Sequence, residues 1–248
     1  MNFPMVDLSI VIAAYNEENR LPRTLERYFR YLKMFPITYE IIIVDDGSRD
    51  RTKAVVEDMA KMHPGLRFLS HFPNRGRGTS IREGVLATQG EVILETDADG
   101  SVDDEAIGRF LEYFKNHPEI DAIFGSRELP DSKIAKRQPR LRVFLGHGFI
   151  FLAKILFRLW HTSDFTLGFK MFRKDTAGDI FSHQFDDHFL AEAEIVFVLH
   201  RRGWRVAELP VTWSDNRDSR VRPFRDSLRS LKGLMKILWR DFKGEYKK

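Results

Sequence analysis

Two aspartates, Asp97 and Asp99, lie one residue apart just after the apolar run 92–94. A short run of this kind predicts a buried strand. Carboxylates this close repel each other, and a hard divalent cation with oxygen ligands offsets such repulsion. A Mg²⁺ or Mn²⁺ ion held by one or two carboxylates commonly completes its shell with substrate phosphates. The pair therefore indicates a metal-assisted site for the diphosphate of a nucleotide.

Two further polar clusters follow predicted strands: residues 15–18 (YNEE) and residues 45–48 (DDGS). Each of them alone is also a common helix cap or turn. Ligands of open α/β sheets bind at the carboxyl ends of the strands, so the three clusters together predict one ligand site. In that site Asp46 could accept a hydrogen bond from a base N–H, and Glu17 one from a ribose hydroxyl.

A basic segment with two glycines, residues 74–78 (NRGRG), precedes a predicted helix. Glycine permits close backbone approach, and a helix N-terminus favours anions, so Arg75 and its neighbours could serve an anionic ligand. The segment lacks the Lys-Ser/Thr ending of a P-loop, which argues against an ATPase. A solvated loop is an equally good interpretation of this segment alone.

Several kinds of site are excluded or disfavoured by composition. The 248 residues include no cysteine, which removes disulfides and thiolate metal sites. There is no Gly-x-Ser-x-Gly motif, and the 8 histidines show no metal-ligand spacing.

Residues 215–248 hold 11 Lys or Arg and 5 Asp or Glu, so this tail is strongly basic and suggests an anionic partner. Its basic residues are not interleaved with aromatics as in a nucleic-acid groove, so we expect no nucleic-acid partner.

The chain alternates between predicted strands and helices. The strand-like runs are 8–13, 40–44, 66–69, 92–95 and 122–124, and the helix-period segments are 21–34, 51–62, 79–88 and 103–116. This order predicts an α/β fold with a parallel sheet covered on both faces. A strand at 168–172, a helix at about 187–202 and a strand at 206–209 are expected to extend the same sheet. The N-terminus is expected to form the first strand, not a signal peptide.

Two segments suggest contact with a lipid surface. Residues 224–243 form a basic amphipathic pattern whose apolar positions are Phe224, Leu228, Leu231, Met235, Leu238 and Phe242. The Phe-rich stretch 141–160 is interrupted by charged residues and falls short of the roughly 20 apolar residues of a spanning helix. We expect Phe149, Phe151 and Phe157 of this stretch to face the interface. The alternatives are a terminal helix packed on the core and a buried helix pair broken near residues 146–148.

The sequence resembles a known family. Residues 8–18, 44–50 and 97–99 resemble the three N-terminal signatures of family 2 glycosyltransferases with the GT-A fold. The segments that resemble the dolichyl-phosphate β-glucosyltransferases more narrowly are 74–78, 125–127, 168–172 and 219–224. The resemblance implies a GT-A (Rossmann-like), mostly parallel central sheet flanked by helices, with amphipathic interface helices in the second half. It also implies a metal-dependent, inverting transfer of glucose from UDP-glucose to a polyprenyl (dolichyl) phosphate, with Mg²⁺ or Mn²⁺ as cofactor.

The resemblance also implies roles for individual residues, carried over by position. Nucleotide-sugar contacts are implied for Ala14, Tyr15, Glu17, Asp46, Arg75, Asp97 and Ala98. Metal ligands are implied at Asp97 and Asp99. The residues implied for the chemistry are Asp99, Arg127, Arg142 and Arg220. Of these arginines, Arg127 and Arg142 would face the acceptor phosphate, and Arg220 would approach the donor phosphates.

The same resemblance implies a single domain over residues 1–248. Residues 1–124 would be its nucleotide-sugar-binding half, 125–223 its acceptor-binding half and 224–248 its basic C-terminal helix. It implies a peripheral protein on the cytoplasmic face of a membrane, either the endoplasmic reticulum or the plasma membrane.

The chain departs from its relatives in two places. It has Glu192 where relatives often have Asp, and Leu167 where they have a cysteine or another small residue. The Gln-x-x-Arg-Trp signature of processive synthases is absent, which favours one transfer per binding event.

The chemistry fits a site rich in arginine and carboxylate. A phosphate monoester is mostly ionised near neutral pH, because its second pKa is about 6, so it can attack without a strong base. Arginine pairs bidentately with phosphate.

Three alternatives remain: a GDP-mannose-dependent enzyme on the same acceptor, a transferase with a soluble acceptor, and a non-catalytic GT-A scaffold. A nucleotidyltransferase is disfavoured, because the first strand is not followed by a glycine-rich loop.

Overall fold

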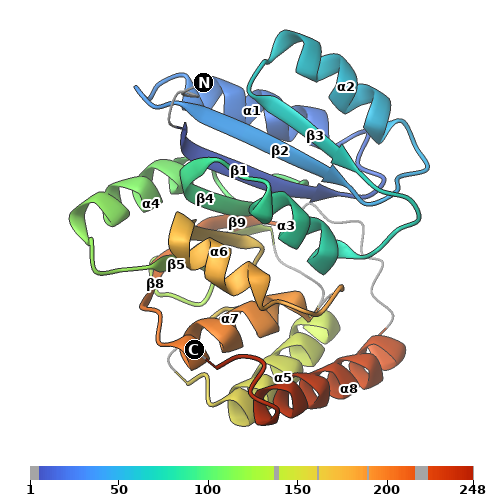
Figure 1. Ribbon diagram of the computed structural model, residues 1–248, viewed down its shortest axis with the longest axis vertical. Coiled ribbons are helices and arrows are strands. Elements are labelled where there is room, and N and C mark those ends of the chain that lie inside the picture. Colours follow the sequence, from blue (N-terminus) through green and yellow to red (C-terminus); the bar gives the residue numbers. More distant parts are fainter. Residues whose placement is uncertain (1–5, 137–139, 161, 189, 216–222, 248) are drawn as a thin grey trace.

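A seven-stranded sheet forms the centre of the molecule, with helices on both of its faces (Figure 1). The computed structural model describes residues 6–136, 140–160, 162–188, 190–215 and 223–247. The sheet has the order β3-β2-β1-β4-β7-β5-β8. Its strands, in chain order, are β1 (Val6–Ala14), β2 (Tyr39–Asp45), β3 (Leu66–Ser70), β4 (Gly90–Asp97), β5 (Ala122–Ser126), β7 (Phe169–Arg173) and β8 (Val206–Pro210). A small second sheet pairs β6 (Lys133–Lys136) with β9 (Thr212–Ser214).

The predicted alternation of strands and helices is confirmed for the first half of the chain. The helices are α1 (Leu21–Leu32), α2 (Thr52–Met62), α3 (Arg77–Leu86), α4 (Glu105–Asn116), α5 (Arg140–Phe157), α6 (Lys174–Ser182), α7 (Ala191–Arg202) and α8 (Pro223–Phe242). Strands β3, β2, β1 and β4 are parallel neighbours. The sheet is not parallel throughout, because β7 lies antiparallel between β4 and β5. Strand β7 was predicted but its direction was not, and α6, β6 and β9 were not predicted.

The two faces of the sheet bury two separate hydrophobic clusters. Side chains alternate between the faces along β1, so Ile10 and Ile12 belong to one cluster and Val11 to the other. The first cluster is covered by α1, α2 and α4, and the second by α3, α5, α6, α7 and α8. Burial on both faces explains why β1 is a nearly continuous apolar run. The loops at the strand ends are thereby left free to carry polar groups.

Helix α5 is continuous through residues 146–148, so the alternative of a helix pair broken near these residues is excluded. Among its described side chains, Phe157 is buried against Phe197 of α7, with ring centroids 4.7 Å apart. The prediction that Phe157 faces the interface is therefore wrong. Phe151 is 59% exposed, as predicted for an interface position. The side chain of Phe149 lies outside the described part.

Helix α8 lies beside α5 at the lower edge of the molecule (Figure 1). Its buried side chains are Leu234 and Ile237, whereas Met235 and Phe242 of the predicted apolar stripe are exposed. The helix therefore packs on the core through the face that carries Leu234 and Ile237. Gly233 lets its backbone approach Leu190 closely there. Within the described ranges, no helix combines the length and the apolar character needed to cross a membrane.

Candidate active site

A pocket opens at the carboxyl ends of β1, β2 and β4 and has a volume of about 250 Å³. Its lining residues are Ala13, Ala14, Tyr15, Glu17, Arg20, Asp46, Arg77, Asp97, Ala98 and Asp99. Seven of these were singled out from the sequence, and the parallel pairing of the three strands brings them together. Arg20 and Arg77 were not singled out. Arg75 and Arg127 were predicted for the site but do not line this pocket.

The loops after β1 and β2 are bonded to each other. The backbone N–H of Asn16 donates to Ser48 Oγ at 2.9 Å, and that of Glu17 donates to Thr52 Oγ1 at 2.8 Å. Asn16 adopts a positive φ of 57°, a conformation that asparagine tolerates better than most residues. The Glu17 carboxylate accepts from Arg20 Nε at 2.7 Å. These contacts fix the first two acidic clusters as one rim of the pocket.

The two aspartates after β4 have different partners. Asp99 Oδ1 accepts from the backbone N–H of Ser101 at 3.0 Å, an Asx-type turn that fixes its side chain. Asp97 Oδ1 accepts from Arg77 Nη2, also at 3.0 Å. Asp97 thus has an arginine as a partner, and Asp99 lies beside it in the lining of the pocket. Among the described residues there is no group of three or more His, Cys, Asp or Glu that could hold a metal ion.

A buried ionic cluster lies beneath Asp97. Arg77 Nη2 also donates to Glu95 Oε1 at 3.0 Å, while Arg77 Nη1 donates to Glu192 of α7. The fully buried Lys170 of β7 donates to Glu192 as well, and to the carbonyl of Leu167 at 2.6 Å. None of Arg77, Glu95, Lys170 and Glu192 was predicted as a site residue. One signal was available: Glu95 and Asp97 are two residues apart on a strand and so share a face.

The cluster divides its protons unevenly. Burial, together with the neighbouring charge of Glu192, raises the pKa of Glu95 to about 8. Burial alone would raise the pKa of Glu192, but the charges of Lys170 and Arg77 outweigh it and lower that pKa to about 2. This environment favours the proton on Glu95 and the charge on Glu192. The two cations, Arg77 and Lys170, offset the carboxylate charge, which lets the cluster remain buried.

Gly168, at the start of the predicted 168–172 segment, makes room for this cluster. A Cβ atom at this position would lie 2.5 Å from Arg77 Nη2 and 2.8 Å from Asp97 Oδ1. Contacts this short force the guanidinium or the carboxylate to move. The glycine is therefore needed for the approach of β7 to the floor of the pocket.

We expect Gly168→Ala to weaken binding of the pocket's ligand by about 10-fold or more, because displacing Arg77 disturbs a charge-assisted hydrogen bond to Asp97. Calorimetry with UDP would measure the effect. Gly178→Ala in α6 is the matched control, since its new Cβ meets no atom within 4 Å. That control should leave binding unchanged and stabilise the helix by about 1 kcal/mol. Equal affinities of the two variants would contradict the assigned role of Gly168.

Arg127 lies at the end of β5, where it is bound to Asp164. Its Nε and Nη2 donate to the two carboxylate oxygens at 2.7 and 2.9 Å, and its side chain lies over the Trp213 ring at 5.3 Å. Burial alone would raise the pKa of Asp164, but the hydrogen bond and charge of Arg127 lower it. Glu208 of β8 accepts from the backbone N–H groups of Ser163 and Asp164 at 2.8 and 3.1 Å and so holds this loop in place. The side chain of Arg142, in the first turn of α5, and all of Arg220 lie outside the described residues.

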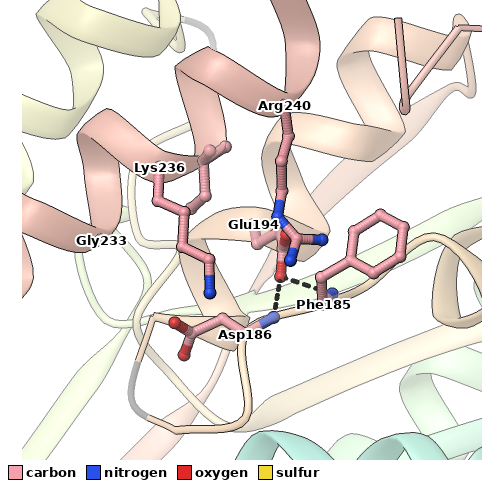
Figure 2. A pocket seen from close by; sticks show the side chains of 7 residues that line it. Phe185, Asp186, Glu194, Gly233, Lys236 and Arg240 are labelled. Atoms are coloured by element: carbon pink, nitrogen blue, oxygen red, sulfur yellow. Dashed lines mark hydrogen bonds between the residues drawn. The ribbon is translucent and has the colours of Figure 1, made fainter. Parts of the chain in front are cut away.

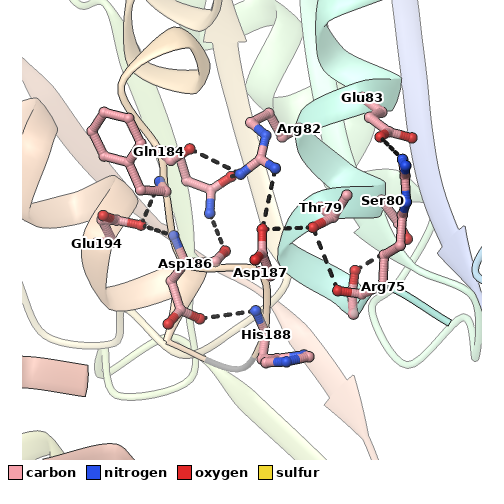
Figure 3. A network of polar contacts seen from close by, with 12 residues as sticks. Arg75, Thr79, Ser80, Arg82, Glu83, Gln184, Asp186, Asp187, His188 and Glu194 are labelled. Atoms are coloured by element: carbon pink, nitrogen blue, oxygen red, sulfur yellow. Dashed lines mark hydrogen bonds and ion pairs between the residues drawn. The ribbon is translucent and has the colours of Figure 1, made fainter. Parts of the chain in front are cut away.

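Arg75 points away from the pocket toward α3. Its Nη1 donates to Glu83 at 2.8 Å, and its side chain is 54% exposed (Figure 3). The neighbouring loop 184–188 packs against the start of α3, where Asp187 accepts from Thr79 Oγ1 at 2.8 Å and from Arg82 Nη2 at 3.2 Å (Figure 3). Arg75 therefore contributes to the pocket through its backbone, which donates to Asp46 at 2.7 Å.

Loop 184–188 is anchored from its other side by Glu194 of α7. The Glu194 carboxylate accepts from the backbone N–H of Phe185 at 2.9 Å and of Asp186 at 2.6 Å (Figure 2). It also accepts from the hydroxyl of the buried Tyr246. The cavity between these residues and α8 is only about 10 Å³. A cavity of this size holds at most one water molecule, so Glu194 has a structural role here.

Comparison with known proteins agrees with this geometry. The family model described as glycosyl transferase family 2 matches residues 9–181. The chain belongs to this family. A dolichyl-phosphate beta-glucosyltransferase of Trichomonas vaginalis is 36% identical over 88% of this chain and 68% of its own length. The human dolichyl-phosphate beta-glucosyltransferase is 32% identical over 98% of this chain and 78% of its own length.

Solved structures show the same fold. Glucosyl-3-phosphoglycerate synthase from Mycobacterium tuberculosis, in complex with UDP, superposes with a TM-score of 0.66 at 16% identity, over 94% of this chain and 80% of its own. S. aureus TarS in complex with UDP gives a TM-score of 0.63 at 17% identity, over 94% of this chain and 64% of its own. These likenesses confirm the GT-A fold that the resemblance implied. This member of glycosyl transferase family 2 thus carries its acidic pocket where the fold places ligands.

Proposed function

We propose that this glycosyltransferase moves glucose from UDP-glucose to a polyprenyl phosphate at the cytoplasmic surface of a membrane, with inversion at the sugar carbon. The observation that carries the proposal is the convergence of three acidic clusters in one pocket, in a chain whose relatives over most of its length are dolichyl-phosphate β-glucosyltransferases. Within the pocket, Ala14, Tyr15, Glu17 and Asp46 would hold the uridine. Asp97 and Ala98 would contact the ribose or sugar side of the donor.

The donor set at Asp99 fits a hard divalent cation. Its carboxylate lines the pocket together with those of Glu17, Asp46 and Asp97, and the chain contains no cysteine. Mg²⁺ or Mn²⁺ bound there would supply Lewis-acid stabilisation of the departing diphosphate. A solved M. tuberculosis glucosyl-3-phosphoglycerate synthase complex contains Mn²⁺ and UDP-glucose, which supports the same choice of ion.

The acceptor would be recognised by arginine. A lipid phosphate brings its own nucleophilic oxygen, so the protein has to hold two anions close together and needs no activated serine or histidine. Arg127 supplies a fixed guanidinium, because Asp164 and Thr166 hold its orientation. Arg142 and Arg220 are the other two arginines proposed to contact phosphate. The side chain of Arg142 and all of Arg220 lie outside the described residues.

The exposed surface of α5 and α8 suits a lipid interface. The exposed fractions of Phe151, Trp160, Trp239 and Phe242 are 59%, 58%, 56% and 88%. Lysines accompany these side chains: Lys232 and Lys236 lie in α8, and Lys243 follows it, with its ammonium 3.5 Å from the centre of the Trp239 ring. Aromatic side chains and basic residues together favour the interface of an anionic leaflet.

We expect the triple variant Trp160→Ser, Trp239→Ser, Phe242→Ser to lose at least about 10-fold in affinity for vesicles of anionic phospholipid, because each buried aromatic contributes about 1.5–3 kcal/mol. Vesicle flotation measures this. Met62→Ser is the control, because Met62 is 71% exposed but ends α2 at the opposite edge of the molecule (Figure 1). Unchanged flotation of the triple variant would remove α8 and Trp160, which follows α5, from the proposed interface.

The proposed function is tested by incubating the purified protein with labelled UDP-glucose and a polyprenyl phosphate, with and without EDTA. We expect label in the lipid fraction, lost on chelation and restored by Mg²⁺ or Mn²⁺. GDP-mannose and UDP-N-acetylglucosamine, offered in parallel, should give little product. Transfer from GDP-mannose alone would overturn the choice of donor, and the absence of any UDP-sugar binding would favour the scaffold interpretation.

A further inference from the structure

Asp46 is held in the pocket by hydrogen bonds from several directions. Its backbone N–H donates to Ala14 at 2.8 Å, and its carbonyl accepts from the Asn74 amide at 2.9 Å. Its carboxylate accepts from the backbone N–H of Arg75 at 2.7 Å and from that of Gly76. A side chain completes this set: His71, from the loop after β3, places Nε2 2.7 Å from Asp46 Oδ1.

The two oxygens of this carboxylate are used unequally. Oδ1 receives His71, Arg75 and Gly76, whereas among the described residues Oδ2 receives only the Gly76 N–H, at 3.0 Å. A carboxylate oxygen has room for about two strong hydrogen bonds. Oδ2 is therefore the oxygen with capacity left for a ligand, and Asp46 lines the pocket.

His71 lies between two carboxylates. Its Nε2 is hydrogen-bonded to Asp46, whereas its Nδ1 lies 3.3 Å from Glu83 Oε2 without forming a hydrogen bond. Glu83 in turn pairs with Arg75 at 2.8 Å (Figure 3). The imidazole is therefore tied to Asp46.

We propose that His71 is a positioning residue for nucleobase recognition, which keeps Asp46 as a pure hydrogen-bond acceptor with Oδ2 offered to the pocket. The proposal rests on the proposed function, since it requires a nucleotide in this pocket. An acceptor-only carboxylate pairs with a base whose ring nitrogen carries a hydrogen, as uracil does. It repels a base that presents a ring nitrogen lone pair at the same position, as cytosine does, so His71 contributes to the choice between them.

A merely structural role for His71 would give a different result. If the imidazole only packed the loop after β3, its loss would lower stability and affect every nucleotide equally. If it orients Asp46, its loss should affect uracil selectively. A glutamine should rescue binding, because its amide can donate to Asp46 from nearly the position of Nε2.

The test is calorimetric binding of UDP and CDP to wild type, His71→Leu and His71→Gln. We expect His71→Leu to weaken UDP binding by about 10-fold or more with little change for CDP, since a hydrogen bond to a charged group is lost. His71→Gln should stay within about threefold of wild type. In His71→Leu, kcat at saturating UDP-glucose should hold while KM rises. If His71→Leu does not fold, His71→Asn replaces it, because its shorter amide cannot reach Asp46. His63→Leu is the matched control, as His63 stacks on Phe29 at 3.8 Å and does not line the pocket.

Equal losses for UDP and CDP, or no loss for UDP, would overturn the role of His71. Failure of the wild-type protein to bind UDP would instead reject the proposed function, so the two failures are distinguishable.

Discussion

Replacing Asp99 by alanine is expected to reduce glucosyl transfer by about 1,000-fold or more while leaving the fold intact. Under the proposed function, Asp99 would hold the cation that stabilises the leaving diphosphate, a contribution of several kcal/mol. Each loss of about 1.4 kcal/mol lowers the rate tenfold. The side chain lines the pocket and belongs to neither hydrophobic cluster, so we expect the fold to survive its removal. Labelled transfer and a thermal melt, measured on the same preparation, give the two readouts.

Asp58→Ala is a suitable control for this experiment. Asp58 is a solvent-exposed acid on α2 that pairs with Lys61 at 2.7 Å and does not line the pocket. Its replacement should change neither turnover nor stability appreciably, because exposed ion pairs contribute little. An Asp99→Ala protein with wild-type turnover would contradict the assigned role.

Replacing Lys170 by methionine is expected to destabilise the protein by about 3–5 kcal/mol. Lys170 is fully buried and is bonded to Glu192, so its removal leaves a buried carboxylate with less compensation. Denaturant unfolding would measure the change. The double variant Lys170→Met, Glu192→Gln should recover much of the loss, because no uncompensated charge then remains.

Lys174→Met provides the matched control for Lys170. Lys174 pairs with Glu91 at 3.1 Å, and both side chains are about half exposed. Its loss should cost less than about 1 kcal/mol. Equal stability losses for Lys170→Met and Lys174→Met, or no recovery in the double variant, would show that the buried cluster is not under the expected electrostatic constraint.

The pocket could be predicted from the sequence because its residues follow strands directly. Residues 15–18, 45–48 and 97–99 each come after an apolar run, and parallel strands bring their carboxyl ends to one edge. The apolar runs and the rule that parallel strands end at one edge were sufficient to predict this pocket. The same information identified the first five strands and the first four helices.

The ionic cluster could not be predicted in this way, since it depends on long-range pairing. Lys170 reaches Glu95 because β7 runs antiparallel beside β4, where Lys170 and Glu95 are register partners. Neither residue has a sequence neighbour that reveals this. The sequence predicted Arg75 for the site, whereas Arg77 lines the pocket in the structure. The cause is local: α3 begins at Arg77, two residues earlier than expected, and its first turn directs Arg77 to the pocket.

Helix α8 shows a further limit of periodicity. The pattern identified an amphipathic helix, but residues 234 and 237 face the core and Met235 and Phe242 do not. The helix has apolar side chains on two adjacent faces, and Gly233 packs closely against Leu190 on the buried one. Composition alone does not distinguish a core-facing stripe from a lipid-facing one.

The most direct test of the central claim is an anomalous difference map from crystals grown with UDP and Mn²⁺. We expect one manganese peak within coordination distance of the Asp99 carboxylate and of the diphosphate, with the uracil beside Asp46. A nucleotide bound elsewhere, or a manganese ion remote from Asp99, would contradict the account.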